Sequence, residues 1–263
     1  MNSNNPVLGR GFGQGQRYAT FDAPPTPAAG DLQDMYNRPA YAPARYMTLD
    51  DVVVKTAALL GVIVVTGGLA WAFNLGGLAI VGALVGFVLA LVISFRQSTN
   101  PALILSYAAA EGLFLGGISR IFNDAFGGGI VIQAVTGTAA VFAGMLVVYK
   151  TGAIRVTPKF TRWLLGALIG VVGLMLVNLL VGFFNGGGGL GLRDSGNLPL
   201  AVGFSLLCIG IAALTFLLDF DMIDQAIRQG APERFAWYAA FGLVVGLVWL
   251  YLEILRLLSY FRE

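Results

Sequence analysis

The chain has 263 residues, of which 57% are hydrophobic and only 11% are charged, and its mean hydropathy is +0.78. A soluble domain carries roughly 25% charged residues, so this composition excludes a water-soluble fold and indicates a polytopic membrane protein. The net charge of +2 gives no indication of a nucleic-acid partner. There is no histidine, and the one cysteine, Cys208, lies in an apolar run. Histidine-based catalysis, an internal disulfide and a thiolate metal site are therefore excluded.

Residues 1–47 form the first segment and contain no apolar run long enough to be buried. They are rich in Gly, Pro, Ala, Asn and Gln, a composition that predicts a disordered tail. A loose cytoplasmic tail is the simpler interpretation, and binding of membrane-protein partners through the tail is the alternative. The tyrosines that would serve such binding are Tyr18, Tyr36, Tyr41 and Tyr46.

Seven apolar segments follow the tail, each close to the roughly 20 residues that a helix needs to cross a bilayer. We expect transmembrane helices at 52–74, 78–95, 101–118, 129–149, 163–184, 199–223 and 236–260. The predicted fold is an all-α bundle of about seven transmembrane helices over residues 48–263, with the lipid bilayer as its solvent.

The distribution of basic residues predicts the orientation of this bundle. The loop 150–162 is the most basic, so the positive-inside rule places it in the cytoplasm together with the tail, the 96–100 turn and the 224–235 loop. We therefore expect a cytoplasmic N-terminus and an external C-terminus. In the loops, the chain end and the second half of the tail, the basic residues divide into Arg38, Arg45, Arg96, Lys150, Arg155, Lys159, Arg162, Arg228 and Arg234 inside, against Arg120, Arg193 and Arg262 outside.

Ionisable side chains within membrane helices are costly and usually face the bundle interior or a water path. Asp219 and Asp221 are about 200° apart around a helix, so both cannot face one cavity. Glu253 and Arg256 share a helix face, where an internal ion pair is an alternative to a functional role. A structural role and a functional role are equally open for the mid-helix carboxyl of Glu111. The full set of candidates is Glu111, Asp219, Asp221, Glu253, Arg96 and Arg256.

The sequence contains no motif of a known catalytic site. A Walker loop, HExxH, GxSxG, a Gly-x-Gly-Asp string and a carboxylate cluster with metal-binding spacing are all absent. We therefore expect neither an enzyme nor a cofactor. A helix bundle with a few buried acids is more consistent with the passage of ions or protons.

Three stretches resemble the Bax inhibitor-1 (transmembrane Bax inhibitor motif) family, and particularly its bacterial branch. They read SYAAAEG at 106–112, LLDFDMI at 217–223 and WLYLEIL at 249–255. The resemblance implies a bacterial inner-membrane protein in which six helices surround a central seventh. It also implies a pH-sensitive calcium leak, in which two acidic residues on the sixth and seventh helices share a proton. An arginine near the end of the second helix takes part in the closed state of that family.

Transferred to this chain, the resemblance assigns the first acid to Asp219 and the arginine to Arg96. Two positions remain open for the second acid. Glu253 matches the local context of that acid, whereas an alignment without gaps places Gly246 there. These positions are two helical turns apart, so either the seventh helix is shifted relative to the family or the standard acid pair is missing.

The leading hypothesis is a leak for calcium or other cations, gated by protonation of intramembrane carboxylates. Asp219 and Glu253 would be the sensor and Arg96 their partner, with Glu111 and Asp221 as further residues of the ion path. Two carboxyls within hydrogen-bonding reach hold one proton between them, so such a sensor needs no histidine. The alternative is a non-conducting membrane scaffold or regulator that binds other membrane proteins.

Overall fold

The computed structural model describes residues 45–184, 189–191 and 197–262, and most of the predicted tail lies outside these residues, as does Arg193. Each of the seven helices formed by the described residues is long and apolar enough to cross a membrane. The prediction of an all-α polytopic membrane protein is thereby confirmed. The helices are α3 (Leu49–Ala72), α4 (Gly77–Arg96), α5 (Pro101–Phe126), α6 (Ile130–Thr151), α7 (Pro158–Phe184), α8 (Leu198–Arg228) and α9 (Phe235–Tyr260).

Local signals in the sequence account for several helix ends. Thr48 caps α3, because its hydroxyl accepts a hydrogen bond from the backbone N–H of Asp51. At the start of α5, the Asn100 side chain accepts from the N–H of Ala102, and Pro101 occupies the first turn, where its missing N–H costs nothing.

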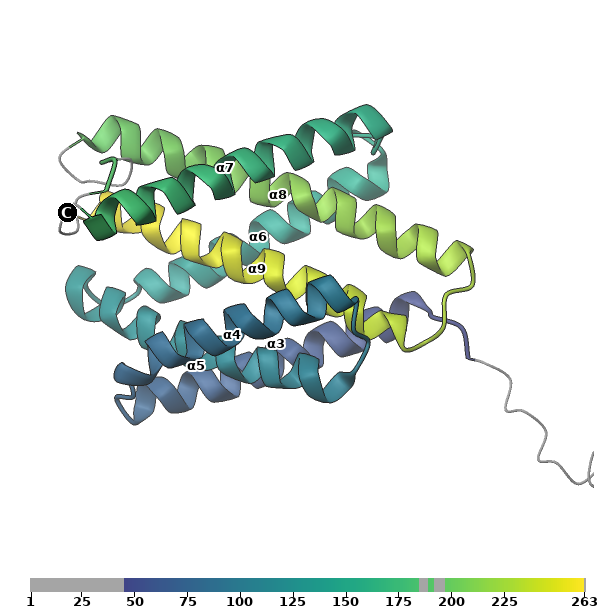
Figure 1. Cartoon of the computed structure of the whole chain (residues 1–263), viewed down its shortest axis with the longest axis horizontal. Helices are drawn as coiled ribbons and strands as arrows, with labels where there is room; N and C mark the ends of the chain where they lie inside the picture. Colours follow the sequence, from purple (N-terminus) through teal and green to yellow (C-terminus); the bar gives the residue numbers. More distant parts are fainter. Residues whose placement is uncertain (1–44, 185–188, 192–196, 263) are drawn as a thin grey trace, which may run out of the picture. The chain divides into compact units, whose positions relative to one another are not determined.

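Helix α9 occupies the centre of the bundle. It packs against α3, α5, α6 and α8, and Figure 1 shows it between α8 on one side and α3, α4 and α5 on the other. Its side chains Val244 and Leu250 are fully buried. The expected central position of the seventh helix is therefore confirmed. Helix α4 packs on α5 and helix α7 packs on α8, so both lie away from the centre.

Glycines allow α5 to approach its neighbours closely. A Cβ atom on Gly116 would clash with the backbone of Gly67 in α3. A Cβ atom on Gly82 of α4 would lie 2.7 Å from the carbonyl oxygen of Ala110, which is too close. In membranes, small residues stabilise helix pairs by increasing van der Waals contact between backbones. The abundance of glycine in the chain thus has a packing role at these two contacts.

The outer faces of α4 and α7 carry large apolar side chains that no other described helix covers. Phe95 of α4 is 85% exposed and Phe183 of α7 is 83% exposed. Such surfaces are stable in contact with lipid tails and not with water. The protein is an integral membrane protein.

Candidate functional site around the central helix

Asp219 lies on the side of α8 that packs against α9. Its Oδ1 atom is 3.7 Å from the point where a Cβ atom on Gly242 would sit, so the carboxyl faces backbone and no intervening side chain. The side chain is half-buried. No hydrogen bond or ion pair to Asp219 is formed by the residues that the structure describes. A carboxyl in such a place is stable when protonated and costly when ionised.

Asp221, two residues further along α8, has a different environment. Its Oδ2 atom accepts a hydrogen bond of 2.6 Å from Nε2 of Gln225, on an exposed part of the helix. Asp224 forms an ion pair of 2.7 Å with Arg228 on the same helix. The two aspartates of the LLDFDMI stretch therefore point to different sides, as their angular separation requires. Asp219 is the one that faces the centre.

Gly246, the position that a gapless alignment gives to the second acid, faces Phe216. A Cβ atom there would lie 2.9 Å from Cε1 of the Phe216 ring. Phe216 is fully buried, and its ring packs edge-on against Phe142 of α6 at 5.1 Å between centroids. Aromatic packing therefore fills the space in which an acidic side chain at position 246 would have to fit.

Glu253 is also on α9 and is only 3% exposed, but it lies far from Asp219. Asp219 faces Gly242, and Glu253 is eleven residues beyond Gly242 on the same continuous helix. At 1.5 Å per residue the separation along α9 is about 16 Å. The two carboxyls are thus beyond hydrogen-bonding reach, and the structure does not bring the expected pair together.

Glu111 is buried between α4 and α5. Its Oε1 atom lies 3.0 Å from the point where a Cβ atom on Gly86 would sit, and Tyr107 interacts with the same carboxyl from one turn earlier. Its Oε2 atom has no hydrogen-bond partner among the described residues. The glycine at position 86 therefore makes room for this buried carboxyl, on the side of the bundle where α4 packs.

Arg96 is exposed in the last turn of α4. It forms no ion pair with any acidic residue in the described part of the chain, and α4 packs on α5 rather than on α8. The structure therefore places Arg96 apart from Asp219. A role for Arg96 beside the acids would require a different arrangement of α4.

A sequence model of the family described as Bax inhibitor 1 like matches residues 5–263, which is essentially the whole chain. This chain belongs to that family. A protein of Chlamydia muridarum (strain MoPn / Nigg) that carries the description "Uncharacterized protein" is 37% identical over 130 residues. That similarity covers 49% of this chain and 48% of the Chlamydia protein, so the chain matches about half the length of that relative.

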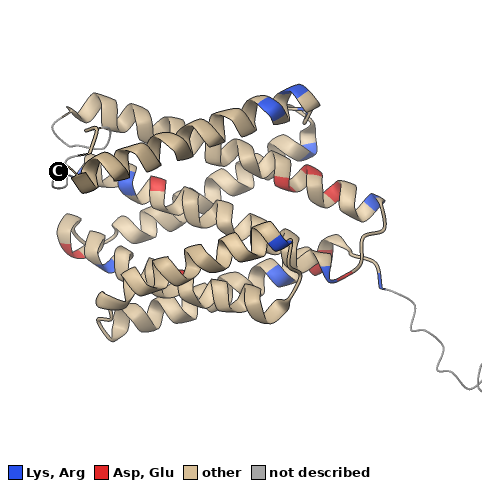
Figure 2. Ribbon diagram, viewed as in Figure 1, with Lys and Arg blue, Asp and Glu red and all other residues tan. Residues whose placement is uncertain are grey.

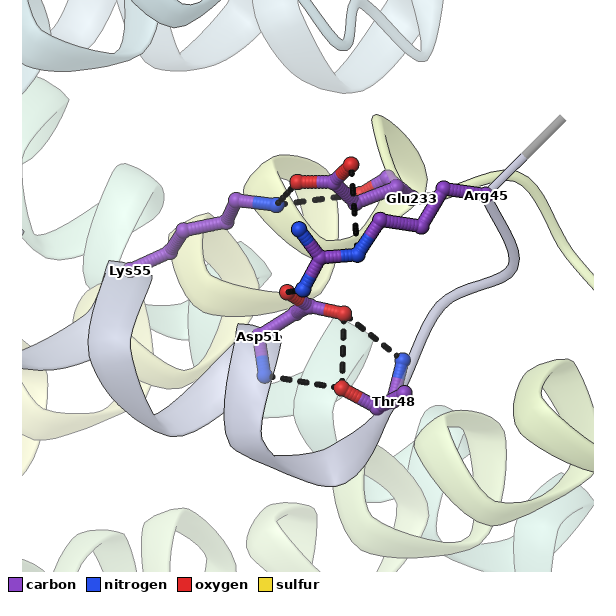
Figure 3. Close-up of polar contacts among 5 residues, drawn as sticks. All are labelled: Arg45, Thr48, Asp51, Lys55 and Glu233. Carbon is purple, nitrogen blue, oxygen red and sulfur yellow. Dashed lines mark hydrogen bonds and ion pairs between the residues drawn. The ribbon is translucent and has the colours of Figure 1, made fainter. Parts of the chain in front are cut away.

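This Bax inhibitor 1 like protein also contains a polar cluster that sequence reasoning missed. Figure 3 shows the cluster, which we call the clasp. Arg45 pairs with Asp51 at 3.1 Å and with Glu233 at 3.8 Å, and Lys55 pairs with Glu233 at 3.3 Å. The Thr48 hydroxyl donates to Asp51 at 2.7 Å. The clasp consists of Arg45, Thr48, Asp51, Lys55 and Glu233, and it joins the start of α3 to the segment between α8 and α9.

Backbone contacts reinforce the clasp. The N–H of Met47 donates to the carbonyl of Ala231, and the N–H of Glu233 donates to the carbonyl of Arg45. Met47 itself is 2% exposed. The pattern Thr48-x-x-Asp51 is a capping-box signature that a reading of the sequence could have detected. Glu233 carries no comparable signal, because its partner Lys55 is 178 residues away.

Proposed function

We propose that the protein is a pH-sensitive leak for calcium or other cations, and a passive pathway rather than an enzyme. The observation that carries the proposal is the position of Asp219. Its carboxyl faces the backbone of the central helix at Gly242, and none of the described residues forms an ion pair with it. Loss of its proton would loosen the packing of α8 on α9.

The free energy of charging Asp219 drives this step. An ionised carboxylate held against helix backbone in a low-dielectric interior is unfavourable, and it gains stability when water or a cation reaches it. Movement of α8 away from Gly242 would provide that access. Calcium, a hard cation that prefers oxygen ligands, is suited to a carboxylate exposed in this way.

The positions of Glu253 and Glu111 support an ion path with several separate carboxyl groups rather than a single acid pair. Both are buried, Glu253 about 16 Å along α9 from the level of Asp219 and Glu111 at the contact of α5 with α4. Conduction requires sites that bind a cation weakly enough to release it, and separate carboxylates satisfy that requirement better than one tight cluster.

Calcium flux in proteoliposomes across a series of pH values tests the proposal. We expect the flux to rise with pH, because ionisation opens the pathway, and a single carboxyl changes its ionised fraction by up to about tenfold per pH unit. Asp219→Asn, which mimics the protonated acid, should hold the flux at its low-pH level. Asp221→Asn is the matched control, since Asp221 lies on the same helix and faces away from α9. It should leave the pH response unchanged.

Two results would contradict the proposal. An absence of protein-dependent flux at every pH would remove the leak and favour a non-conducting scaffold that binds other membrane proteins. An unchanged pH response in Asp219→Asn would leave a leak whose gate lies elsewhere. Folding of each variant is checked first by its thermal unfolding in detergent.

The bacterial plasma membrane is the location that we propose for the protein, and the charge distribution supports a cytoplasmic N-terminus there. Figure 2 shows that most of the Lys and Arg residues lie at the end of the bundle where α3 begins and α8 ends. The positive-inside rule assigns that end to the cytoplasm. Labelling of single cysteines in a Cys208→Ser background tests the orientation, and a cysteine in the 152–157 loop should react only from the cytoplasmic side.

A further inference from the structure

A cleft of about 470 Å³ lies between α3, α5, α6 and α9, away from Asp219. Val64 of α3 and Val135 of α6 both line it, and their side chains are 71% and 54% exposed. The cleft is therefore open at the side of the bundle, between α3 and α6. In a membrane this opening faces the acyl chains of the lipids.

The cleft is long and follows the direction of the helices. Its α3 wall is a continuous stripe of residues that begins at Thr56 and ends at Trp71. These residues are fifteen apart, which is about 22 Å of helix rise. The hydrocarbon core of a bilayer is about 30 Å thick, so the stripe covers most of it. Gly68 widens the cleft in its outer half, because it contributes no side chain and the place of its missing Cβ atom is open space.

The walls of the cleft are largely apolar. The Thr56 hydroxyl at one end has no hydrogen-bond partner among the described residues, whereas the other hydroxyl groups of the cleft bond to protein atoms. The hydroxyls of Ser119 and Tyr251 lie 2.6 Å apart and bond to each other. The Thr138 hydroxyl donates to the carbonyl of Ala134 at 2.8 Å. Water is disfavoured in such a space, since it needs two to four polar partners. An empty cleft would forfeit the dispersion contacts of all its wall atoms. At this depth in the bilayer, acyl chains are the molecules available to fill it.

A cationic side chain stands at one end of the cleft. Arg120 follows Ser119 in α5 and donates a hydrogen bond to the carbonyl of Trp71, and both of these neighbours line the cleft. Its pairing with Asp124 is weak, because the two charged groups are 3.7 Å apart and the Asp124 side chain is largely exposed. A guanidinium group with free N–H donors matches the oxygens of a phosphate. At the other end, Lys55 next to Thr56 is already paired with Glu233 in the clasp.

We propose that the cleft binds one acyl chain of a membrane phospholipid, whose phosphate contacts Arg120. The chain lies along α3 between Leu60 and Trp71, in contact with α6 and α9. Gly68 is a position where a mutation can reduce this occupancy. A side chain added there would enter the open space of the cleft. The bound acyl chain would fill the space between α3 and α6 and keep the two helices apart. This role does not depend on the acidic residues around α9.

Photocrosslinking of the full-length protein in vesicles tests the proposal. The probe is a phosphatidylglycerol that carries a diazirine near the end of one acyl chain, and the crosslinked peptides are identified by mass spectrometry. We expect saturable labelling of the cleft walls on α3 and α6. Gly68→Leu should fill the cleft and lower this labelling roughly fivefold, a change of about 1 kcal/mol in binding.

Gly61→Leu is the matched control. Gly61 is on the same helix, has open space around it and does not line the cleft. It should leave the labelling unchanged. Arg120→Gln, which keeps a donor for the Trp71 carbonyl and removes the charge, should weaken labelling of the cleft by the anionic probe. Arg120→Lys should restore part of it.

Thermal unfolding in detergent gives a second readout. Added phosphatidylglycerol should raise the unfolding temperature of the wild type and of Gly61→Leu, and should raise that of Gly68→Leu less. Labelling spread evenly over the outer faces of α4 and α7, and unaffected by Gly68→Leu, would overturn the proposal. So would equal effects of Gly61→Leu and Gly68→Leu on both readouts.

Discussion

Asp219 and Asp221 have the same side chain and lie two residues apart, yet only Asp219 faces the centre of the bundle. The difference follows from the helix period alone, which turns them about 200° apart. Asp221 bonds to Gln225 in an exposed position, whereas Asp219 faces backbone at Gly242. The contact of α8 with α9 at Gly242 therefore involves the Asp219 side chain and not that of Asp221. Asp221→Asn is therefore a suitable control for Asp219→Asn, because the two variants make the same chemical change in different surroundings.

Glu253 provides a prediction at the same scale. Because Asp219 and Glu253 are separated by about 16 Å along α9, they are beyond hydrogen-bonding reach of each other, and mutations that far apart usually have additive effects. We expect the double variant Asp219→Asn/Glu253→Gln to change the free energy of unfolding by the sum of the two single changes, within about 0.5 kcal/mol. Thermal unfolding at several pH values measures this sum. Strong non-additivity would show that the two acids do share a proton.

The sequence predicted the helices well and their ends less well. All seven expected segments lie on observed helices, because a run of about twenty apolar residues has few alternatives in a membrane. Yet α5 continues eight residues past its predicted end at 118, and α7 begins five residues before its predicted start at 163. A hydropathy pattern detects only the apolar part of a helix. Helix α5 continues past that part through polar residues, and Arg120 and Asp124 form an ion pair one turn apart there.

The candidate site was predicted only in part. The LLDFDMI motif identified Asp219, but its contact with Gly242 depends on how α8 and α9 are rotated, and a hydropathy pattern does not contain that information. The structure does not bring Asp219 and Glu253 together. The Phe216 ring fills the space beside Gly246, and Glu253 lies two turns further along α9. Arg96 was expected beside the acids, and the end of α4 lies elsewhere.

At the scale of whole elements, the clasp predicts how far the N-terminal segment can be shortened. Deletion of residues 2–44 leaves the clasp and the buried Met47 intact, so we expect the unfolding temperature to stay nearly unchanged. In the same shortened chain, Arg45→Ala and Met47→Ala remove the ion pairs of Arg45 and the buried side chain of Met47. Loss of one large buried apolar side chain alone costs about 2–5 kcal/mol.

Thermal unfolding of the shortened chain, with and without these two substitutions, checks this prediction in detergent. Equal stabilities would mean that the side chains of Arg45 and Met47 contribute nothing to the bundle. A large loss already in the deletion alone would show that residues before 45 stabilise it. Either result would move the boundary between tail and bundle away from the position that the clasp indicates.

For the whole molecule, the central helix connects the two inferences. One side of α9 faces Asp219 through Gly242, and another side, at Leu247, Val248 and Tyr251, forms a wall of the lipid cleft. Packed helices move as units between discrete arrangements, so a displacement of α8 from α9 extends along both helices. The account therefore requires a change of helix spacing with pH, in addition to a change of flux.

The distance between α8 and α9 as a function of pH tests this requirement most directly. Spin labels at Leu200 and Phe261, in a Cys208→Ser background, would report on the ends of the two helices opposite the loop that joins them, since both native side chains are exposed. We predict a longer distance at high pH in the otherwise native chain and in Asp221→Asn, and a short distance at every pH in Asp219→Asn. A distance that does not change with pH, or one that changes equally in Asp219→Asn, would contradict the account.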